Sequence, residues 1–172
     1  MNDAPFVIVP LSANHDRASF TCGVEPLDRY LRQQASQDVR RRIASCFVIV
    51  EVATGALAGY YTLAATSVLL RELPEPIAAK LPRYPTLPAV LLGRLAVASS
   101  FQRRKLGAVL LADAVGRAAR ADIASFAVVV DPKDHTARQF YQRHGFLDLP
   151  QPEHRMFVPI ESALRFFRSS AG

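Results

Sequence analysis

The sequence has few of the residues that build disulfide frameworks or zinc sites. Only Cys22 and Cys46 are cysteines, and tryptophan is absent. Two cysteines are too few for a disulfide framework, and no His/Cys spacing resembles that of metal ligands. We therefore expect two reduced, buried thiols and no metal site.

Long apolar runs, targeting signals and linkers are also missing. No apolar run reaches the length of a membrane span, and Arg94 interrupts the longest candidate. The opening residues, MNDAPFVIVP, lack the basic and long apolar regions of a signal peptide. We expect a cytoplasmic protein that does not enter the membrane. Without repeats or a Gly/Ser linker, residues 1–172 are predicted to form a single domain.

Negative charge is missing from one long segment. No carboxylate lies between Glu75 and Asp113, where the basic residues are Lys80, Arg83, Arg94, Arg103, Arg104 and Lys105. The formal net charge is +6, and nearly all of the positive charge comes from arginine, whose planar fork suits phosphate and carboxylate groups. A segment charged one way concentrates anionic partners. We expect it to meet a phosphorylated molecule, although a plain basic surface fits the composition equally well.

Hydrophobic periodicity predicts an α/β fold with helices on a mixed sheet. The predicted strands are residues 6–9, 45–51, 56–66, 89–98, 125–130 and about 155–160, with a hairpin turn at Thr54 and Gly55. The predicted helices are residues 26 to about 42, 77–81, about 103–121 and 133–144. The third helix is expected to bury Leu106, Val109, Leu110 and Ala114, and Gly145 to end the fourth.

The segment FQRRKLGA, residues 101–108, combines arginines with a predicted helix start. Backbone N–H groups at a helix N-terminus form a ready anion site, suited to a pyrophosphate. The segment is neither a P-loop nor a dinucleotide-binding GxGxxG motif. By itself it is equally compatible with a basic solvated turn.

This segment resembles motif A of the GNAT acetyltransferases, Q/R-x-x-G-x-G/A, with Gln102 and Gly107 at its ends and Lys105 in place of the middle glycine. The resemblance implies a GNAT fold with splayed strands. It also implies that the backbone of Leu95, Ala96 and Val97 holds the pantetheine arm of acetyl-CoA. The pyrophosphate would then contact the turn formed by Gln102, Arg103, Arg104, Lys105, Leu106, Gly107 and Ala108.

The segment DPKDHTARQFYQRHGF is similar to the closing motif of the same family, N-x-x-A-x-x-x-Y-x-x-x-G-F. Ala137, Tyr141, Gly145 and Phe146 fit the motif, whereas Asp134 replaces its asparagine. A tyrosine on an apolar helix face is by itself more often a core residue. The resemblance implies instead that Tyr141 protonates the departing CoA thiolate.

Further segments, FTCGVEPLDRYL, GYYTLA and LPAVLLGRLAV, resemble the GNAT toxins of bacterial toxin–antitoxin modules. Those enzymes acetylate the α-amine of aminoacyl-tRNA and stop translation. The resemblance therefore implies aminoacyl-tRNA as substrate, a ribbon-helix-helix antitoxin as partner, and a homodimer.

The predicted strand of residues 89–98 bears on which amine receives the acetyl group, because it carries no carboxylate that could act as base. An α-amine with a pKa near 7.8 is about 14% neutral at pH 7, against about 0.04% for lysine. A weakly basic α-amine therefore needs little help, and a backbone N–H near Val97 could stabilise the oxyanion. Arg94, with Arg103 and Arg104, suits the phosphates of a tRNA.

Two other functions are also compatible with the sequence. One is a GNAT enzyme that acetylates a small-molecule amine or a protein N-terminus, because it would share every CoA-binding feature. The other is a basic RNA-binding module without enzymatic activity, which would present aromatic stacking platforms on a sheet face. Acetyl-CoA binding would separate both enzymes from the RNA-binding module.

Overall fold

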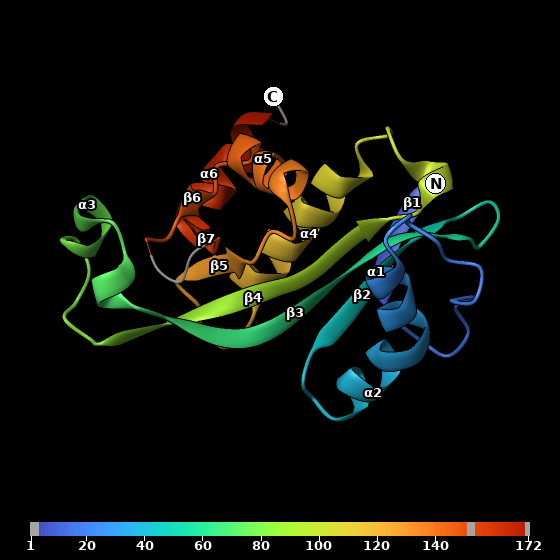
Figure 1. Ribbon diagram of the computed structural model, residues 1–172, viewed down its shortest axis with the longest axis horizontal. Helices are drawn as coiled ribbons and strands as arrows, with labels where there is room; N and C mark the ends of the chain where they lie inside the picture. Colours follow the sequence, from blue (N-terminus) through green and yellow to red (C-terminus); the bar gives the residue numbers. More distant parts are fainter. Residues whose placement is uncertain (1–3, 151–153, 171–172) are drawn as a thin grey trace. The chain divides into compact units, whose positions relative to one another are not determined.

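The computed structural model describes residues 4–150 and 154–170 (Figure 1). In this part of the chain a seven-stranded sheet has the order β1-β2-β3-β4-β5-β7-β6. Its strands are β1 (Phe6–Pro10), β2 (Ser45–Glu51), β3 (Leu57–Leu69), β4 (Thr86–Val97), β5 (Ala127–Val130), β6 (Leu147–Asp148) and β7 (Met156–Pro159). The helices are α1 (Glu25–Arg29), α2 (Ala35–Arg40), α3 (Glu75–Ala78), α4 (Leu106–Arg120), α5 (His135–Arg143) and α6 (Ile160–Ser170). The predicted α/β class is confirmed.

The described chain forms two compact units. The first contains the chain up to Ala64 together with Gly93–Ala114, and the second contains Ala65–Leu92 and the chain from Val115 onward. Strands β3 and β4 and helix α4 therefore contribute residues to both units.

The first unit is built on an antiparallel β1-β2-β3 meander. Ile49 of β2 pairs with Ile8 of β1 and with Gly59 of β3. The predicted hairpin turn is confirmed, because Gly55 has a φ of +76° and its N–H donates to the carbonyl of Glu51. A left-handed residue in a tight turn favours glycine, which has no Cβ to clash.

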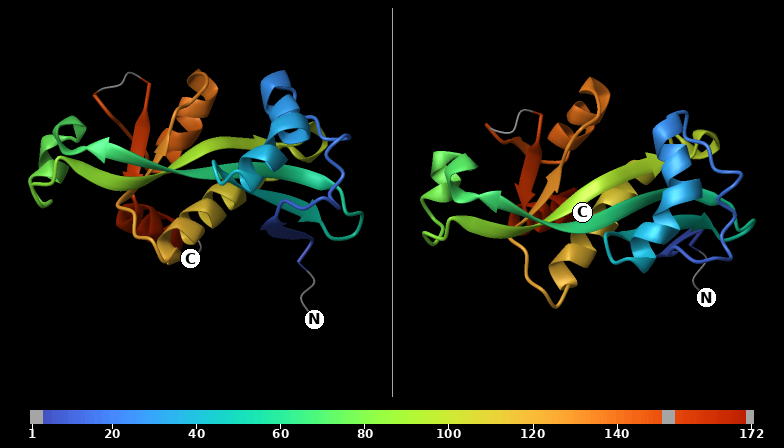
Figure 2. Two further views of the ribbon diagram at one scale, coloured as in Figure 1. Left: turned by 90° about the horizontal axis from the view of Figure 1, so that it is seen from below. Right: turned by 60° about the horizontal axis from the view of Figure 1, so that its bottom comes forward.

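The helix predicted from residue 26 to about 42 is found over residues 25–40, although its middle turn is not α-helical. Pro26 lies in the first turn of α1, but Tyr30–Gln34 forms a π-helical turn before α2 begins. The helix stops at Arg40, and Arg42 has a φ of 61°. Leu31 and Ala35 are fully buried. The segment packs against β2 and can be followed from two sides in Figure 2.

The second unit contains the parallel pair of the sheet. Ala89–Leu91 of β4 runs parallel to β5, which pairs on its other side with β7 in the antiparallel sense. Every residue of β5 is buried. The core around it includes Val68, Leu87 and Phe157.

Two helices of the second unit differ from what the sequence predicts. The short helix expected at residues 77–81 is α3, which begins at Glu75 because Pro76 occupies its first turn, where a missing N–H costs nothing. It lies between the ends of β3 and β4 (Figure 1). Beyond the predicted last strand, found as β7, the chain continues into α6, which the sequence analysis missed. Ile160 and Ala163 bury one side of α6, which packs against β7.

Candidate functional site

The turn after β4 is a strained loop rather than the start of a helix. Helix α4 was expected to begin near residue 103, but it begins at Leu106 because Arg103 and Lys105 have φ angles of 68° and 62°. A non-glycine residue in this left-handed region is uncommon and costs roughly 1–2 kcal/mol. Lys105 stands where the motif has its middle glycine. The backbone therefore keeps a conformation that glycine favours although the glycine is gone.

This turn leaves a row of backbone donors unused. Among the described residues, the N–H groups of residues 102–108 donate no hydrogen bond, and the N–H of Val109 donates to the carbonyl of Lys105 at the start of the helix. The first N–H groups of a helix always lack intrahelical partners. Here the preceding turn adds further free donors. Because these groups combine with the positive end of the α4 dipole, the turn fits a bound phosphate.

The basic side chains of the turn are free for an anion as well. Arg103, Arg104 and Lys105 are exposed, and none of them forms an ion pair within residues 4–150 and 154–170. The Arg104 guanidinium carbon lies 5.2 Å from the centre of the Phe101 ring. Phe101 itself is buried and packs edge-on against Phe6, so the start of the turn is anchored on β1.

The turn is tied to the segment that precedes α1. The side-chain amide of Gln102 donates to the carbonyls of Val97 at 3.1 Å and Cys22 at 3.2 Å. The N–H of Ser99 donates to the carbonyl of Thr21. Gln102 therefore braces the turn through its side-chain amide nitrogen, which is occupied by these two carbonyls. From the sequence, Cys22 was expected only to be a buried thiol.

Asp28 holds the segment of Thr21 and Cys22 to which the Gln102 side chain is hydrogen-bonded. It is 3% exposed and accepts hydrogen bonds from the N–H of Cys22 at 2.8 Å and the hydroxyl of Thr21 at 3.2 Å. Burial alone would raise the pKa of the Asp28 carboxyl, but the hydrogen bonds from Cys22 and Thr21 outweigh it and lower the pKa below its ordinary value. Asp28 is therefore ionised at neutral pH and fixes the Thr21–Cys22 backbone. Its role is not apparent from the sequence.

The strand residues predicted to hold the pantetheine arm lie at the end of β4. Ala96 is buried, and Leu95 and Val97 are half-buried. A Cβ added at Gly59 would lie 2.6 Å from the carbonyl oxygen of Ala96, so glycine is required at this approach of β3. The N–H of Ala98 already donates to the carbonyl of Ala58 and is not available to an oxyanion.

Arg94, on the same strand, lies over an aromatic ring. Its guanidinium carbon is 3.5 Å from the centre of the Tyr30 ring. Arg94 and Tyr30 line a cavity of about 350 Å³ together with Pro26, Leu27, Arg29, Gln33 and Gln34. The predicted substrate residue therefore faces the π-helical turn, which the sequence did not reveal.

Tyr141 belongs to the second unit. It is 8% exposed and packs edge-on against the rings of Phe140 and Phe146. Its hydroxyl has no hydrogen-bond partner among the described residues. Burial raises the pKa of Tyr141 well above its ordinary value, so the hydroxyl keeps its proton at neutral pH.

The helix that carries Tyr141 is capped at its start by Asp134 and ends at the predicted Gly145. Asp134 accepts a hydrogen bond from the N–H of Ala137 at 2.8 Å and caps α5, which begins at His135. Aspartate performs the capping role as well as asparagine does. Gly145 ends the helix with a φ of +90°.

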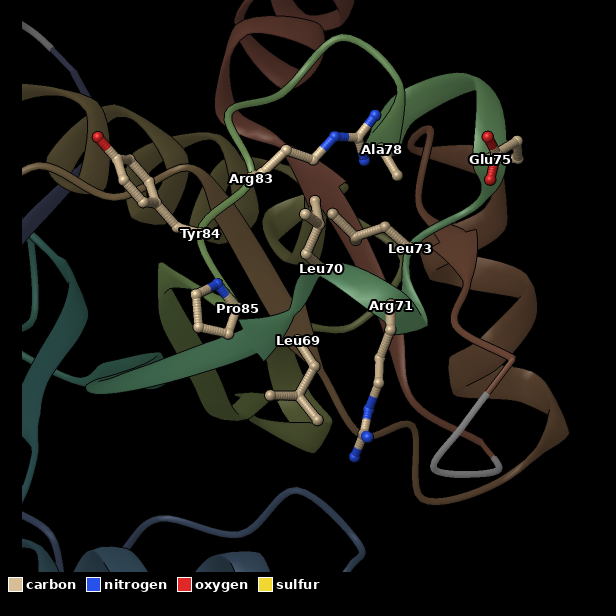
Figure 3. Close-up of a pocket in the computed structure, with 9 residues that line it drawn as sticks. All are labelled: Leu69, Leu70, Arg71, Leu73, Glu75, Ala78, Arg83, Tyr84 and Pro85. Carbon is tan, nitrogen blue, oxygen red and sulfur yellow. The ribbon is translucent and has the colours of Figure 1, made fainter.

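Two further cavities occur in the second unit. One, of about 600 Å³, lies beside α3, where Arg71 and Arg83 point in different directions and Tyr84 points away from both (Figure 3). These arginines do not converge on one anion. The other, of about 620 Å³, is lined by Asp134 and Arg138. Asp134 already caps α5, and Arg138 already pairs with Asp148. No predicted site residue lines either cavity.

Other kinds of site find no support in the described residues. No group of three or more His, Cys, Asp or Glu side chains is arranged to hold a metal ion. In the same residues, no helix is both long and apolar enough to cross a membrane. Cys22 and Cys46 are both buried, and burial raises the pKa of the Cys46 thiol to about 12.

Comparison with known proteins gives a consistent result. The model of the acetyltransferase (GNAT) domain matches residues 83–158. A tRNA-acetylating toxin of Mycobacterium tuberculosis is 35% identical over 151 residues, which cover 86% of this chain and 89% of the toxin.

Solved structures of similar proteins agree with this match. AtaT complexed with acetyl-methionyl-tRNAfMet has a TM-score of 0.85 and 28% identity, over 94% of this chain and 99% of AtaT. A tyrosine-to-phenylalanine mutant of AtaT, bound to acetyl-CoA and the C-terminus of the antitoxin AtaR, has a TM-score of 0.79 and 25% identity. That match covers 95% of this chain and 99% of the mutant.

Proposed function

Because the chain belongs to the GNAT family of acetyltransferases, we propose that it transfers the acetyl group of acetyl-CoA to the α-amine of an aminoacyl-tRNA. Such a reaction blocks translation, so the protein would act as a toxin. The observation that carries the proposal is the turn after β4, with its free backbone N–H groups at residues 102–108, in a relative of tRNA-acetylating enzymes.

Acetyl-CoA fits this turn. The free N–H groups of residues 102–108 would bind its pyrophosphate, with Arg103, Arg104 and Lys105 adding positive charge. The backbone of Leu95, Ala96 and Val97 would hold the pantetheine arm. Acetyl-CoA supplies an activated thioester, and the protein has to orient it, stabilise the oxyanion and protonate the leaving sulfur.

Tyr141 would supply that proton. Its hydroxyl is protonated at neutral pH, is not engaged by another described residue, and is positioned by the rings of Phe140 and Phe146. An acid must carry its proton at the working pH to act, and a raised tyrosine pKa ensures this.

The acceptor would need no dedicated base. Strand β4 (Thr86–Val97) carries no carboxylate, and an α-amine with a pKa near 7.8 is about 14% neutral at pH 7. The carboxylate-free stretch from residue 76 to 112 would attract the tRNA phosphates. A GNAT enzyme acetylating a small amine or a protein N-terminus is the alternative, because its acetyl-CoA site would be the same.

We further propose that the two compact units are parts of one acetyltransferase domain, since β3, β4 and α4 contribute to both. A ribbon-helix-helix antitoxin as partner and a homodimer belong to the same proposal. The support for the partner is the AtaT structure with its antitoxin AtaR.

The function is tested by incubating the pure protein with radiolabelled acetyl-CoA and total charged tRNA. We expect label on aminoacyl-tRNA, none on uncharged tRNA and little on free amino acids. Activity should fall steeply with salt, because phosphate contacts release counterions. Label on a polyamine or peptide but on no charged tRNA would refute the tRNA substrate and support the alternative enzyme.

A further inference from the structure

The cavity beside the π-helical turn contains a guanidinium that is fixed in place but keeps its hydrogen-bond donors free. Arg94 lies on the Tyr30 ring at 3.5 Å, and within the described residues it forms no ion pair or hydrogen bond. Stacking uses the face of a guanidinium and leaves its N–H edge open. Such a group is prepared to bind a planar pair of anionic oxygens.

Tyr30 is itself held on several sides. It is 6% exposed, and its ring stacks on Tyr60 with centres 6.3 Å apart and planes 15° apart. Tyr60 is fully buried, and its hydroxyl donates to the carbonyl of Leu27 at 2.7 Å. The Tyr30 hydroxyl donates to Asp38 at 2.8 Å. The platform under Arg94 is therefore rigid.

Asp38 joins this platform to the cavity wall. It is 8% exposed and also accepts a hydrogen bond from the Gln34 amide at 2.9 Å. The hydrogen bond from Gln34 lowers the pKa of Asp38 against the effect of burial, and Tyr30 and Arg94 lower it further. The ionised carboxylate thus orders Tyr30 and Gln34 and attracts Arg94 toward the ring. The π-helical turn brings these groups together. Such turns are rare in proteins as a whole, and those that occur often lie at functional sites.

The lining of the cavity selects the kind of ligand. Arg29 and Arg94 are its only charged lining residues in the described structure, and Gln33 and Gln34 add neutral polar groups. A volume of about 350 Å³ is that of a small ligand site. Cationic, polar and carboxylate-free walls favour a phosphodiester over an amine.

We propose that Arg94 binds a phosphodiester of the acceptor RNA in this cavity, and that Tyr30 and Asp38 are positioning residues that hold its guanidinium. The proposal rests on the proposed function for the identity of the RNA as substrate. Arg94 precedes the strand residues 95–97 directly, so an RNA phosphate bound here would lie next to the predicted pantetheine site.

The test compares the wild type with Arg94→Met, Tyr30→Leu, Tyr30→Phe and Asp38→Asn, with Arg40→Met as matched control. Arg40 is an exposed arginine at the end of α2, outside the cavity. The affinity for deacylated total tRNA is measured by filter binding over a range of salt concentrations. The affinity for acetyl-CoA is measured by calorimetry, and KM and kcat with charged tRNA by label transfer.

For Arg94→Met we expect a roughly tenfold rise in KM for charged tRNA with little change in kcat. The slope of log affinity against log salt should fall by about 0.7–0.9, as for one lost phosphate contact. Tyr30→Leu should show the same change, and Asp38→Asn a smaller one. Tyr30→Phe, which keeps the ring, should retain a slope close to that of the wild type. Arg40→Met should retain it too.

The outcomes separate the two proposals. If Arg94→Met keeps the wild-type salt slope, the phosphate site is refuted, whatever the enzyme acetylates. If Arg94→Met weakens acetyl-CoA binding but not tRNA binding, the phosphate belongs to CoA and the proposal is wrong. If the wild type acetylates no charged tRNA, the proposed function fails, and the salt slope with deacylated tRNA still decides the site. Should Tyr30→Leu fail to fold, Asp38→Asn decides the positioning role, and an unchanged salt slope for it would refute that role.

Discussion

At the scale of single residues, the candidate site depends on groups whose surroundings set their protonation. Tyr141 is buried among aromatic rings and keeps its proton, whereas Asp28 and Asp38 are buried among hydrogen-bond donors and lose theirs. The difference lies in the neighbours: apolar rings disfavour a charge, and N–H and O–H donors favour one.

Replacing Tyr141 by phenylalanine should test its role as acid directly. The ring packing against Phe140 and Phe146 would be kept, so stability and acetyl-CoA affinity should hardly change. We expect kcat to fall by about two to four orders of magnitude, as for a lost general acid. The measurement is steady-state acetyl transfer beside calorimetric binding of acetyl-CoA. A kcat within a few-fold of the wild type would show that another group donates the proton.

At the scale of elements, the start of α4 shows how a motif can lose a glycine and keep its geometry. Lys105 and Arg103 adopt left-handed φ angles, and Gln102 braces the turn against Val97 and Cys22. The brace supplies interactions that offset the backbone strain. The turn can therefore keep its N–H groups free without the middle glycine.

Substitutions at Lys105 should separate backbone geometry from charge. Lys105→Gly removes the charge but suits the φ of 62°, so acetyl-CoA affinity should stay within a few-fold of the wild type. Lys105→Val removes the same charge but disfavours this φ, and should raise the dissociation constant for acetyl-CoA about tenfold or more. Calorimetry on both folded variants provides the comparison. Equal binding by the two would mean that the left-handed conformation is not required.

At the scale of the whole molecule, charge is distributed unevenly over a basic chain of net charge +6. The carboxylate-free stretch of residues 76–112 contributes to both compact units. The buried carboxylates Asp28 and Asp38 lie in the first unit instead, where each orders a segment of backbone or side chains.

Stability should accordingly depend on pH in the acid range. The native pKa values of Asp28 and Asp38 lie below the value of about 3.9 of an unfolded carboxyl, so the unfolded state takes up protons first. Their contribution is fully present above about pH 5 and is lost as the pH falls through the native values. Urea unfolding from pH 7 to 3 should show this loss. Asp28→Asn should be less stable at pH 7 and lose less on acidification; an unchanged pH profile would contradict the assignment.

The sequence by itself determined the elements whose signals are local. The β-hairpin at Gly55, the buried strand β5, the capped helix α5 and the α/β class follow from turn residues, apolar runs and helix caps, which act over a few neighbours. The predicted start of α4 was about three residues too early, and the predicted end of the α1–α2 segment was about two residues too late. Val109, expected in the core, is 45% exposed, whereas Leu111 is fully buried.

Only the tertiary structure decided how the site is supported. Gln102 reaches Cys22 across 80 residues of chain, and Arg94 stacks on Tyr30 from a distant strand. Such contacts leave no periodicity in the sequence, because they join residues that only the fold brings together. The chemistry of motif residues such as Tyr141 is readable from their order. The groups that hold the site in shape, Asp28, Tyr30 and Asp38, become recognisable only through the burial and hydrogen bonds that folding gives them.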